Sequence, residues 1–358
     1  MKILITGASG FIGSFLVEHG LASGHEVWAG IRATSNLRYL DDCRIRPIRL
    51  DFSNEESLCA LLQQQKAESG AWDIIVHAAG ATKCRNKADF FRTNTAGTEH
   101  FVHALQRTGM VPRQFIYISS LSVYGPVRER RVATHPCAAW NPRDKECGAP
   151  LTASVYDCIH NDDTPQPDTA YGESKLAAER FIMAQQDFPY VILRPTGVYG
   201  PRERDYFLMA KSITGHVDFA PGLKPQELTF VYVKDLVQAV YRIIDKGITQ
   251  KSYFVSDGQT YHSRAFSELL QRELGIRRVL RLKAPLLLLR TICLLAELAG
   301  RLTGKATTLN TDKYNIMKQR NWQCDITPLV NDSGYKPEYD LSRGVAEAVA
   351  WYKNEKWL

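Results

Sequence analysis

The feature that most constrains the fold is a glycine-rich turn close to the N-terminus. A short apolar run, residues 1–5, is followed directly by Thr6-Gly7-Ala8-Ser9-Gly10-Phe11-Ile12-Gly13. Residues 14–22 then show the apolar spacing of a helix. Strand, glycine turn and helix in this order predict the phosphate-binding opening of a dinucleotide-binding fold. The same pattern also occurs in ordinary strand-to-helix turns, so the interpretation needs support from elsewhere in the chain.

Each glycine of this turn has its own expected task. Gly7 permits the tight turn, Gly10 lets the backbone approach a pyrophosphate, and Gly13 lets the helix pack close to the strand. The N-terminus of the helix offers free N–H groups and a partial positive charge to phosphates. We therefore expect Gly7, Gly10, Phe11, Ile12 and Gly13 to contact the cofactor.

Length and composition set outer limits. A chain of 358 residues suits two domains or one large α/β unit. The formal net charge of +7 favours an acidic ligand or an anionic surface, but it does not indicate nucleic acid. Eight scattered cysteines without a C-x-x-C pair predict reduced thiols in the cytoplasm. We expect no signal peptide, because the chain enters the strand and glycine turn at once, and no membrane span, because no apolar run reaches about 18 residues.

The end of the second predicted strand, residues 25–31, bears on the choice of cofactor. A carboxylate there would bind an adenosine ribose and select NAD. This chain has Arg32 instead, which can pair with a 2′-phosphate and stack on the adenosine. The sequence thus favours NADP(H) over NAD(H). The third strand, 45–50, ends at Asp51 and Phe52, which we expect at the edge of the adenine pocket.

The fourth predicted strand, within residues 72–80, runs into a loop of small residues. Ala78 and Ala79 would let the backbone pass beneath the cofactor. His77 lies inside the apolar run, so we interpret it as a packed structural histidine and not as a catalyst. A helix is predicted to begin at Asn94 and to continue to about residue 107.

Hydroxyl side chains follow the fifth predicted strand, 114–118, in the cluster Ser119–Ser122. The carboxyl end of a central parallel strand is where such sheets bind ligands. Farther on, Tyr171 and Lys175 are four residues apart on a predicted helix, so both lie on one face. The ammonium can then lower the pKa of the phenol, which would make Tyr171 an acid or base near neutral pH.

Together these motifs resemble the extended short-chain dehydrogenase/reductases of the NAD-dependent epimerase/dehydratase type, and the resemblance covers nearly the whole chain. Its closest branch is that of hydroxysteroid dehydrogenases, dihydroflavonol reductases and keto-lipid reductases. The motifs that carry it are Thr6-Gly7-x-x-Gly10-x-x-Gly13, His77-Ala78-Ala79, Asn94-x-x-Gly97-Thr98, Ser119-Ser120, Val123-Tyr124-Gly125, Tyr171-x-x-x-Lys175, Arg194-Pro195-Thr196-Gly197-Val198-Tyr199-Gly200-Pro201 and Val231-x-Val233-x-Asp235-Leu236.

The resemblance implies roles for individual residues. Tyr171 exchanges a proton with a substrate oxygen, and Ser120 hydrogen-bonds the same oxygen. Lys175 holds the nicotinamide ribose and lowers the pKa of the phenol, while Asn94 supports a water relay behind Lys175. The remaining expected contacts are Pro195, Thr196 and Val198 on the nicotinamide side, and Thr82 and Ser122 beside Tyr171 at the substrate.

The resemblance also implies the architecture. We expect an α/β fold, a doubly wound parallel sheet of the Rossmann type with a smaller C-terminal cap. Residues 1–195 would form the dinucleotide-binding domain, and residues 229–258 would return to it, first as a strand and helix over 229–246 and then as a strand near Tyr253. Residues 196–228 and 259–358 would form the substrate-binding cap. Helices beginning near Asn94 and Tyr171 form a dimer interface in many relatives, so a homodimer is expected.

The segment 127–154 departs from this pattern. Tyr124 and Tyr171 are 47 positions apart, more than the resemblance predicts. We interpret the insertion as a surface excursion near the substrate mouth. A zinc site built from its histidines and cysteines is disfavoured, because their spacing is irregular and unpaired. The residues concerned are His135, Cys137, Cys147, Cys158 and His160.

A leucine-rich stretch lies in the predicted cap. Residues 285–298 form a helix that is apolar most of the way round, and basic residues flank it over 277–305. The helix could be buried in the cap, could line a lipophilic pocket as in relatives acting on bulky ketones, or could lie on an anionic membrane surface. The arginines could instead hold a diphosphate. The expected location is the cytoplasm, with contact at the inner face of the membrane left open.

These observations favour NADPH-dependent interconversion of a ketone and a secondary alcohol on a lipophilic substrate such as a sterol-like ring, a flavonoid-like ring or a ketosphingoid base. A nucleotide-sugar epimerase with tightly bound NAD is the alternative, although Arg32 fits it poorly. A 4,6-dehydratase is disfavoured, because Leu121 and Ser122 stand where an acid/base carboxylate pair is needed. A non-catalytic dinucleotide-binding sensor or assembly subunit is disfavoured by the intact set of Ser120, Tyr171 and Lys175.

Overall fold

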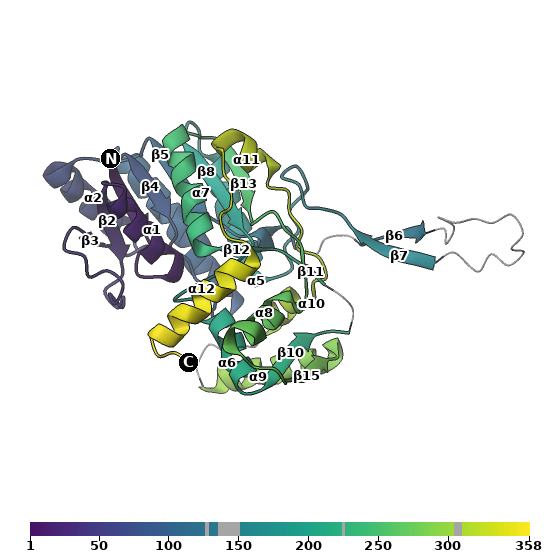
Figure 1. The fold of residues 1–358 in the computed structure, drawn as a ribbon. Helices are drawn as coiled ribbons and strands as arrows, with labels where there is room; N and C mark the ends of the chain where they lie inside the picture. The colour runs from purple at the N-terminus through teal and green to yellow at the C-terminus, as the bar shows by residue number, and fades with distance from the viewer. Residues whose placement is uncertain (126–128, 135–150, 224–225, 304–309) are drawn as a thin grey trace, which may run out of the picture.

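The computed structural model describes residues 1–125, 129–134, 151–223, 226–303 and 310–358. Its centre is a seven-stranded sheet in the order β13-β8-β5-β4-β1-β2-β3, in which every paired strand is parallel (Figure 1). The strands of this main sheet are β1 (Lys2–Thr6), β2 (Glu26–Ile31), β3 (Arg46–Arg49), β4 (Ile74–His77), β5 (Gln114–Ile118), β8 (Tyr190–Pro195) and β13 (Lys251–Val255). The predicted doubly wound α/β fold is confirmed.

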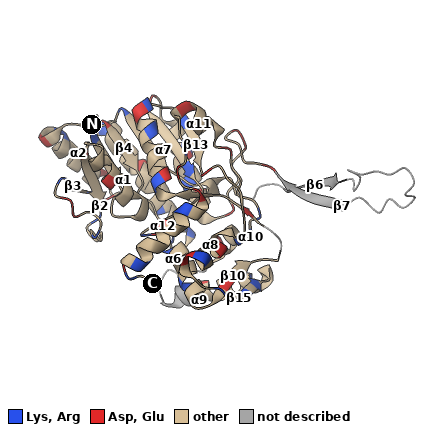
Figure 2. Cartoon of the chain, in the orientation of Figure 1, with Lys and Arg blue, Asp and Glu red and all other residues tan. Residues whose placement is uncertain are grey.

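Helices cover both faces of the main sheet, because apolar side chains leave each strand in alternating directions. One apolar core joins the sheet to α1 (Phe11–Ala22), α7 (Val233–Lys246) and α11 (Thr327–Ser333). A second core, on the opposite face, joins it to α2 (Glu55–Ser69), α4 (Gly97–Thr108) and α5 (Ala170–Ala184). In the view of Figure 2, basic and acidic residues are interspersed along the helices of this region.

The remaining elements lie beyond the ends of these strands (Figure 1). An apolar cluster joins α6 (Asp205–Thr214), α8 (Ala265–Leu274) and α12 (Leu341–Asn354), with Phe230 and Phe266 among its buried rings. The other elements are the strands β9 (Gly197–Tyr199), β10 (Val217–Pro221), β11 (Glu227–Leu228), β12 (Phe230–Tyr232), β14 (Tyr261–His262) and β15 (Leu280–Ala284), and the helices α9 (Leu286–Thr303) and α10 (Thr311–Lys318).

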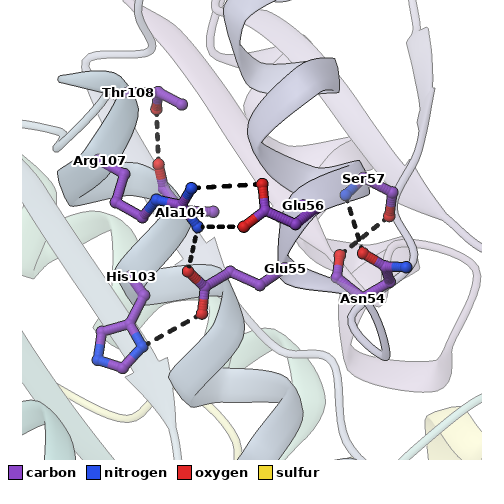
Figure 3. A network of polar contacts seen from close by, with 8 residues as sticks. All are labelled: Asn54, Glu55, Glu56, Ser57, His103, Ala104, Arg107 and Thr108. Atoms are coloured by element: carbon purple, nitrogen blue, oxygen red, sulfur yellow. Dashed lines mark hydrogen bonds and ion pairs between the residues drawn. The ribbon is translucent and has the colours of Figure 1, made fainter.

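Helices α2 and α4 are joined at their exposed ends by a polar network (Figure 3). Arg107 Nη1 lies 2.6 Å from Glu55 Oε1 and 2.8 Å from Glu56 Oε1. Asn54 begins α2 by accepting a hydrogen bond from the N–H of Ser57 at 3.0 Å. Because these side chains are largely exposed, the network fixes the alignment of the two helices more than it adds stability.

Two local predictions were wrong. The helix expected to begin at Asn94 begins earlier, as α3 (Lys87–Phe90), and continues through a π-helix, η1 (Phe91–Ala96), into α4. The strand expected to return to the main sheet near residue 230 does not join it. Instead β12 pairs in parallel with β9 in a two-stranded sheet of its own. The return strand expected near Tyr253 is confirmed as β13.

The leucine-rich helix is not buried, contrary to one of the interpretations of the sequence. Leu289 and Cys293 face inward, but Leu287 and Leu295 are 75% and 67% exposed. Within the described residues, no helix combines the length and apolarity needed to cross a bilayer.

The 127–154 excursion is described only in part. Strands β6 (Glu129–Thr134) and β7 (Leu151–Tyr156) pair antiparallel and extend away from the main sheet in Figure 1. His135, Cys137 and Cys147 lie outside the described residues. Among the described residues, no three His, Cys, Asp or Glu side chains are grouped to hold a metal ion.

Candidate active site

The glycine turn is close-packed. Gly7 adopts a φ of +66°, and the N–H of Gly10 donates to Gly7 O at 2.9 Å. A Cβ on Gly13 would lie 2.2 Å from Gly7 O, so only glycine fits there. Helix α1 begins at Phe11, and no described side chain caps its N-terminus. Its first N–H groups are therefore available to a phosphate, as the sequence predicts.

The turn meets the loop that follows β4. A Cβ on Gly7 would lie 2.8 Å from Ala78 O, so the predicted cofactor residues of the two loops are brought together. Thr6 joins them as well, since its Oγ1 lies 2.8 Å from His77 Nδ1 and accepts a hydrogen bond from the N–H of Ala79 at 3.1 Å. Burial, helped by the nearby Lys175 ammonium, lowers the pKa of His77 to about 3. His77 is thus a neutral, packed side chain.

The residues predicted to bind the adenosine lie at the next two strand ends. Arg32 follows β2 and is exposed, and its backbone N–H donates to Ser35 Oγ at 3.0 Å. Because β2 and β3 are paired, Asp51 and Phe52 emerge at the same edge of the sheet. Phe52 is half-buried against the ring of Phe101, with centroids 5.2 Å apart. Arg32 is therefore free to turn toward a ligand at this edge.

Ser120 and Tyr171 meet at the carboxyl end of β5. Ser122 Oγ donates to Ser120 Oγ at 2.8 Å, which orients the Ser120 hydroxyl. Burial raises the pKa of Tyr171 above its usual range, and a hydrogen bond with Ser120 opposes that rise. The expectation that Lys175 lowers the pKa of this phenol is therefore not met. The two hydroxyls form a pair that can bind and protonate one oxygen atom.

Lys175 follows Tyr171 by four residues in α5 and is buried. Its Nζ donates to Ile118 O at 2.9 Å and lies 4.7 Å from the centre of the Tyr117 ring. Burial lowers the pKa of Lys175 to about 8, although the Glu179 carboxylate opposes the shift. Glu179 is itself paired with buried Arg194 at 2.8 Å, so one buried carboxylate serves both buried cations.

Asn94 ties the loop after β4 to the helix of Tyr171. Its Oδ1 accepts a hydrogen bond from the N–H of Ala81 at 2.7 Å, and its Nδ2 donates to Ser174 Oγ at 3.0 Å. A Cβ on Gly80 would lie 3.0 Å from Lys175 Nζ and 3.2 Å from Asn94 Oδ1. The loop thus passes close over both side chains, which places Asn94 behind Lys175.

The other predicted site residues occupy the rim and the wall. Pro195 ends β8, and Thr196 follows with its N–H bonded to Val255 O at 3.1 Å. Val198 lies in β9, opposite Val231 of β12. Thr82 is exposed in the loop after β4, whereas Ser122 is buried behind Ser120. Thr82 is therefore more exposed to solvent than Ser120 and Ser122, and its predicted contact with the substrate stays a prediction.

One residue at this site carries no signal in the sequence. Asp312, at the start of α10, accepts hydrogen bonds from the N–H groups of Ala170 at 3.1 Å and Tyr171 at 3.2 Å. Thr169 caps the same helix by accepting from the N–H of Gly172 at 2.9 Å. Together they accept hydrogen bonds from the N–H groups of the first turn of α5 and so fix the position of Tyr171. Thr6 and Ser174 were also missed, although both adjoin recognised motifs.

A hollow of about 250 Å³ is lined by residues of β10, α9 and α10 and of the loops beside them. Its lining residues include Leu223, Leu286, Met317 and Lys318, and none of Ser120, Tyr171 and Lys175. The hollow is thus distinct from the hydroxyl pair, although Lys318 reaches toward Tyr171's helix through an ion pair with Asp168 at 3.3 Å.

Comparison with known proteins agrees with this geometry. The model of the NAD dependent epimerase/dehydratase family matches residues 3–145 and 149–256. A GDP-6-deoxy-D-mannose reductase of Pseudomonas aeruginosa is 27% identical over 75% of this chain and 79% of its own. A 3-beta-hydroxysteroid dehydrogenase of Mycolicibacterium neoaurum is 26% identical over 98% and 91%.

A similar solved structure is that of dTDP-glucose 4,6-dehydratase from Bacillus anthracis in complex with NAD. It superposes with a TM-score of 0.73 over 100% of this chain and 98% of its own, at 18% identity. At that identity the likeness concerns the fold alone.

Proposed function

The chain belongs to the NAD dependent epimerase/dehydratase family, and from that premise we propose that it interconverts a ketone and a secondary alcohol on a bulky lipophilic substrate with NADP(H). It is an NAD(P)-dependent enzyme of the extended short-chain dehydrogenase/reductase type. The observation that carries the proposal is the hydroxyl pair of Ser120 and Tyr171, with the buried ammonium of Lys175 four residues farther along the same helix.

The proposed mechanism uses these groups in order. The carbonyl oxygen of the substrate accepts hydrogen bonds from Ser120 and Tyr171, and the phenol passes its proton to that oxygen. When bound, the dihydronicotinamide supplies the hydride that reaches the carbonyl carbon. We assign to Lys175 the binding of the nicotinamide ribose. Proton transfer by a positioned group contributes about 10² to 10⁴-fold in rate.

The glycine turn supports dinucleotide binding, because a Cβ would fill the space at Gly7 and Gly13. The preference for NADP(H) is the finer part of the proposal. It is supported by Arg32, exposed at the end of β2 with a backbone N–H already bonded to Ser35. A guanidinium there can pair with a 2′-phosphate in bidentate geometry.

The lipophilic substrate is proposed from two observations. The relatives include a 3-beta-hydroxysteroid dehydrogenase similar over nearly the whole chain. Leu121 and Ser122 follow Ser120, so the carboxylates that a 4,6-dehydratase would need there are absent from this position. Candidate substrates are a hydroxysteroid-like ring, a dihydroflavonol-like ring and a long-chain keto-lipid such as a ketosphingoid base.

A second candidate is action on a nucleotide sugar, including epimerisation with tightly bound NAD. The 27% identity to a GDP-6-deoxy-D-mannose reductase favours it. In that case the ketone to be reduced, or formed transiently, would belong to a sugar ring. The same hydroxyl pair would serve both candidates, so the distinction lies in the cap and the cofactor.

We also propose the division into a dinucleotide-binding domain, 1–195 with 229–258, and a cap, 196–228 with 259–358. The separate apolar cluster around α6, α8 and α12 supports it. A homodimer formed through α4 and α5 is proposed as well, since the two helices share one face of the main sheet. Light scattering on the purified protein would test the dimer.

The function is tested by turnover of a panel of hydrophobic ketones and of nucleotide sugars with the cofactor-stripped protein. We expect NADPH oxidation with at least one hydrophobic ketone. Tyr171→Phe should lose most of this turnover and keep NADPH binding, followed by fluorescence, while Tyr190→Phe should keep both. Full turnover by Tyr171→Phe would refute the assigned role. NAD that resists stripping, with turnover of nucleotide sugars only, would establish the second candidate instead.

A further inference from the structure

Helix α9 presents its apolar side chains outward. Leu288, Ile292 and Leu295 recur at the spacing of one helical face, and all three are exposed. The opposite face, with Leu289 and Cys293 at 2% and 1% exposure, packs on the cap. The outer face of a helix on a water-exposed surface normally carries polar residues. The exposed apolar face of α9 therefore indicates that an apolar partner covers it.

The apolar surface extends beyond the helix. Strand β15 precedes α9 directly and exposes Leu280, 62% accessible, and Leu282. Its partner strand β10 exposes Phe219, and Leu223 follows β10. We call this set the α9 surface, and its exposed apolar residues are Phe219, Leu223, Leu280, Leu282, Leu286, Leu287, Leu288, Ile292, Leu294 and Leu295. It is far more contiguous than scattered surface leucines are.

The charges around the α9 surface are predominantly positive. Between residues 277 and 303 the chain carries six Lys or Arg and a single carboxylate, Glu297. Glu297 is already engaged, because its Oε2 accepts a hydrogen bond from Thr311 Oγ1 at 2.6 Å. Of the described cations here, Arg281 alone makes ion pairs within the described residues, at 3.8 Å to Glu268 and 4.0 Å to Asp218. The exposed cations that make no ion pair within the described residues are Arg277, Arg278, Lys283 and Arg290.

We propose that the α9 surface binds the face of an anionic lipid bilayer, with α9 lying in the interface plane. Leucines on the outer face would enter the boundary of the acyl chains, and the unpaired cations would meet lipid phosphates. A helix of 18 residues with exposed leucines along its outer face suits this placement. An acidic protein partner would satisfy the cations but not ten exposed apolar residues next to them, and a second copy of this chain would bring like charges together.

The α9 surface is connected to the catalytic helix. Glu297 of α9 binds Thr311 at the start of α10, and the neighbouring Asp312 binds the N–H of Tyr171 at 3.2 Å. A bilayer on this surface would thus lie on the cap side of the site. The idea that this arrangement brings a lipophilic substrate to the site rests on the proposed function. The proposed binding to a bilayer does not rest on it.

The test is co-sedimentation of the full chain with vesicles, which needs no turnover and so can fail independently of the proposed reaction. Vesicles of phosphatidylcholine alone are compared with vesicles containing about one third phosphatidylglycerol. We expect at least tenfold tighter binding to the anionic vesicles, weakened by salt because the phosphate contacts are screened. Equal binding to both kinds, or binding to neither, would overturn the proposal.

Variants separate the two contributions. Leu287→Gln with Leu295→Gln should weaken binding to anionic vesicles at least tenfold without unfolding the protein, because both side chains are exposed. Lys283→Glu with Arg290→Glu should abolish the preference for anionic lipid. The matched control is Val111→Gln with Val330→Gln, exposed apolar residues on the main-sheet region, which should change nothing. If the leucine variant dissociates a dimer and leaves vesicle binding intact, the surface is an interface between two copies and the proposal is wrong.

Discussion

The carboxylate of Asp312 accepts a hydrogen bond from the backbone N–H of Tyr171 at 3.2 Å, across 141 positions of sequence. Its other oxygen accepts from the N–H of Ala170 at 3.1 Å. The charge also lies at the N-terminus of α5, where it interacts favourably with the helix dipole. A residue of α10 thereby fixes the first turn of the helix that presents the phenol.

Replacing Asp312 should affect both stability and turnover. Asp312→Ala leaves two N–H groups without an acceptor, so we expect a loss of about 1 kcal/mol in the free energy of unfolding. Turnover should fall while dinucleotide affinity stays constant, since only the position of Tyr171 is disturbed. Asp312→Asn keeps an acceptor oxygen and should lose less. Urea unfolding and steady-state kinetics measure the two effects, with exposed Asp162→Ala as control; equal behaviour of Asp312→Ala and the control would contradict the prediction.

A methyl group at Gly13 should disrupt the phosphate turn. The added Cβ would lie 2.2 Å from Gly7 O, and backbone on both sides would have to move. We expect Gly13→Ala to lose about 1–3 kcal/mol of stability and to bind the dinucleotide at least tenfold more weakly. Fluorescence titration and thermal unfolding report these changes. Gly215→Ala, whose Cβ meets nothing closer than 3.3 Å, serves as the matched control. Unchanged affinity in Gly13→Ala would mean that the turn does not hold the phosphates.

Arg32 should determine which dinucleotide binds. A hydrogen bond to a charged group contributes about 1.5–3 kcal/mol, so Arg32→Ala should weaken NADPH binding by about 10- to 100-fold. NADH, which lacks the 2′-phosphate, should bind the variant and the original protein alike. Exposed Arg180→Ala controls for the change in net charge. An equal loss for both dinucleotides would show that Arg32 does not read the 2′-phosphate.

His77 should make stability depend on pH. Burial lowers the pKa of His77 to about 3, below the ordinary value of 6.5, so the unfolded chain binds more protons between these values. The lowered pKa of His77 therefore has no effect on stability above about pH 6.5. Below that value the free energy of unfolding decreases as the pH decreases toward 3. Between pH 7 and pH 5 the original protein should lose about 2 kcal/mol relative to His77→Gln. Urea unfolding of the two proteins at pH 7 and at pH 5 measures this difference. If the free energy of unfolding changed with pH in the same way in the original protein and in His77→Gln, the prediction would be wrong.

The parts of the fold that were predicted from the sequence rest on local patterns. The turn from Gly7 to Gly13 is determined by adjacent residues, and the face shared by Tyr171 and Lys175 follows from helical spacing. Strands with continuous apolar runs, such as 114–118, are easily recognised because both of their faces are buried. The doubly wound architecture was predicted from the family resemblance that these motifs carry.

What could not be predicted depends on long-range contacts. Nothing near Asp312 indicates that it binds Tyr171, since only the folded chain brings them together. The start of the helix at Lys87 was missed because the π-turn after it interrupts the apolar period. For α9, a helix apolar nearly all round has no face that periodicity can assign, so the outward direction of Leu288 and Leu295 had to come from the structure.

The π-helix from Phe91 to Ala96 gives this helix one residue more than a regular α-helical path would use. A single residue corresponds to about 100° of rotation around a helix axis. Deleting one residue ahead of Asn94 within this stretch would restore a regular helix and turn the amide away from Ala81 and Ser174, leaving α4 in place. The extra residue thus sets the rotation of Asn94 about the helix axis. It lets α4 pack against α2 while the Asn94 amide points to the site.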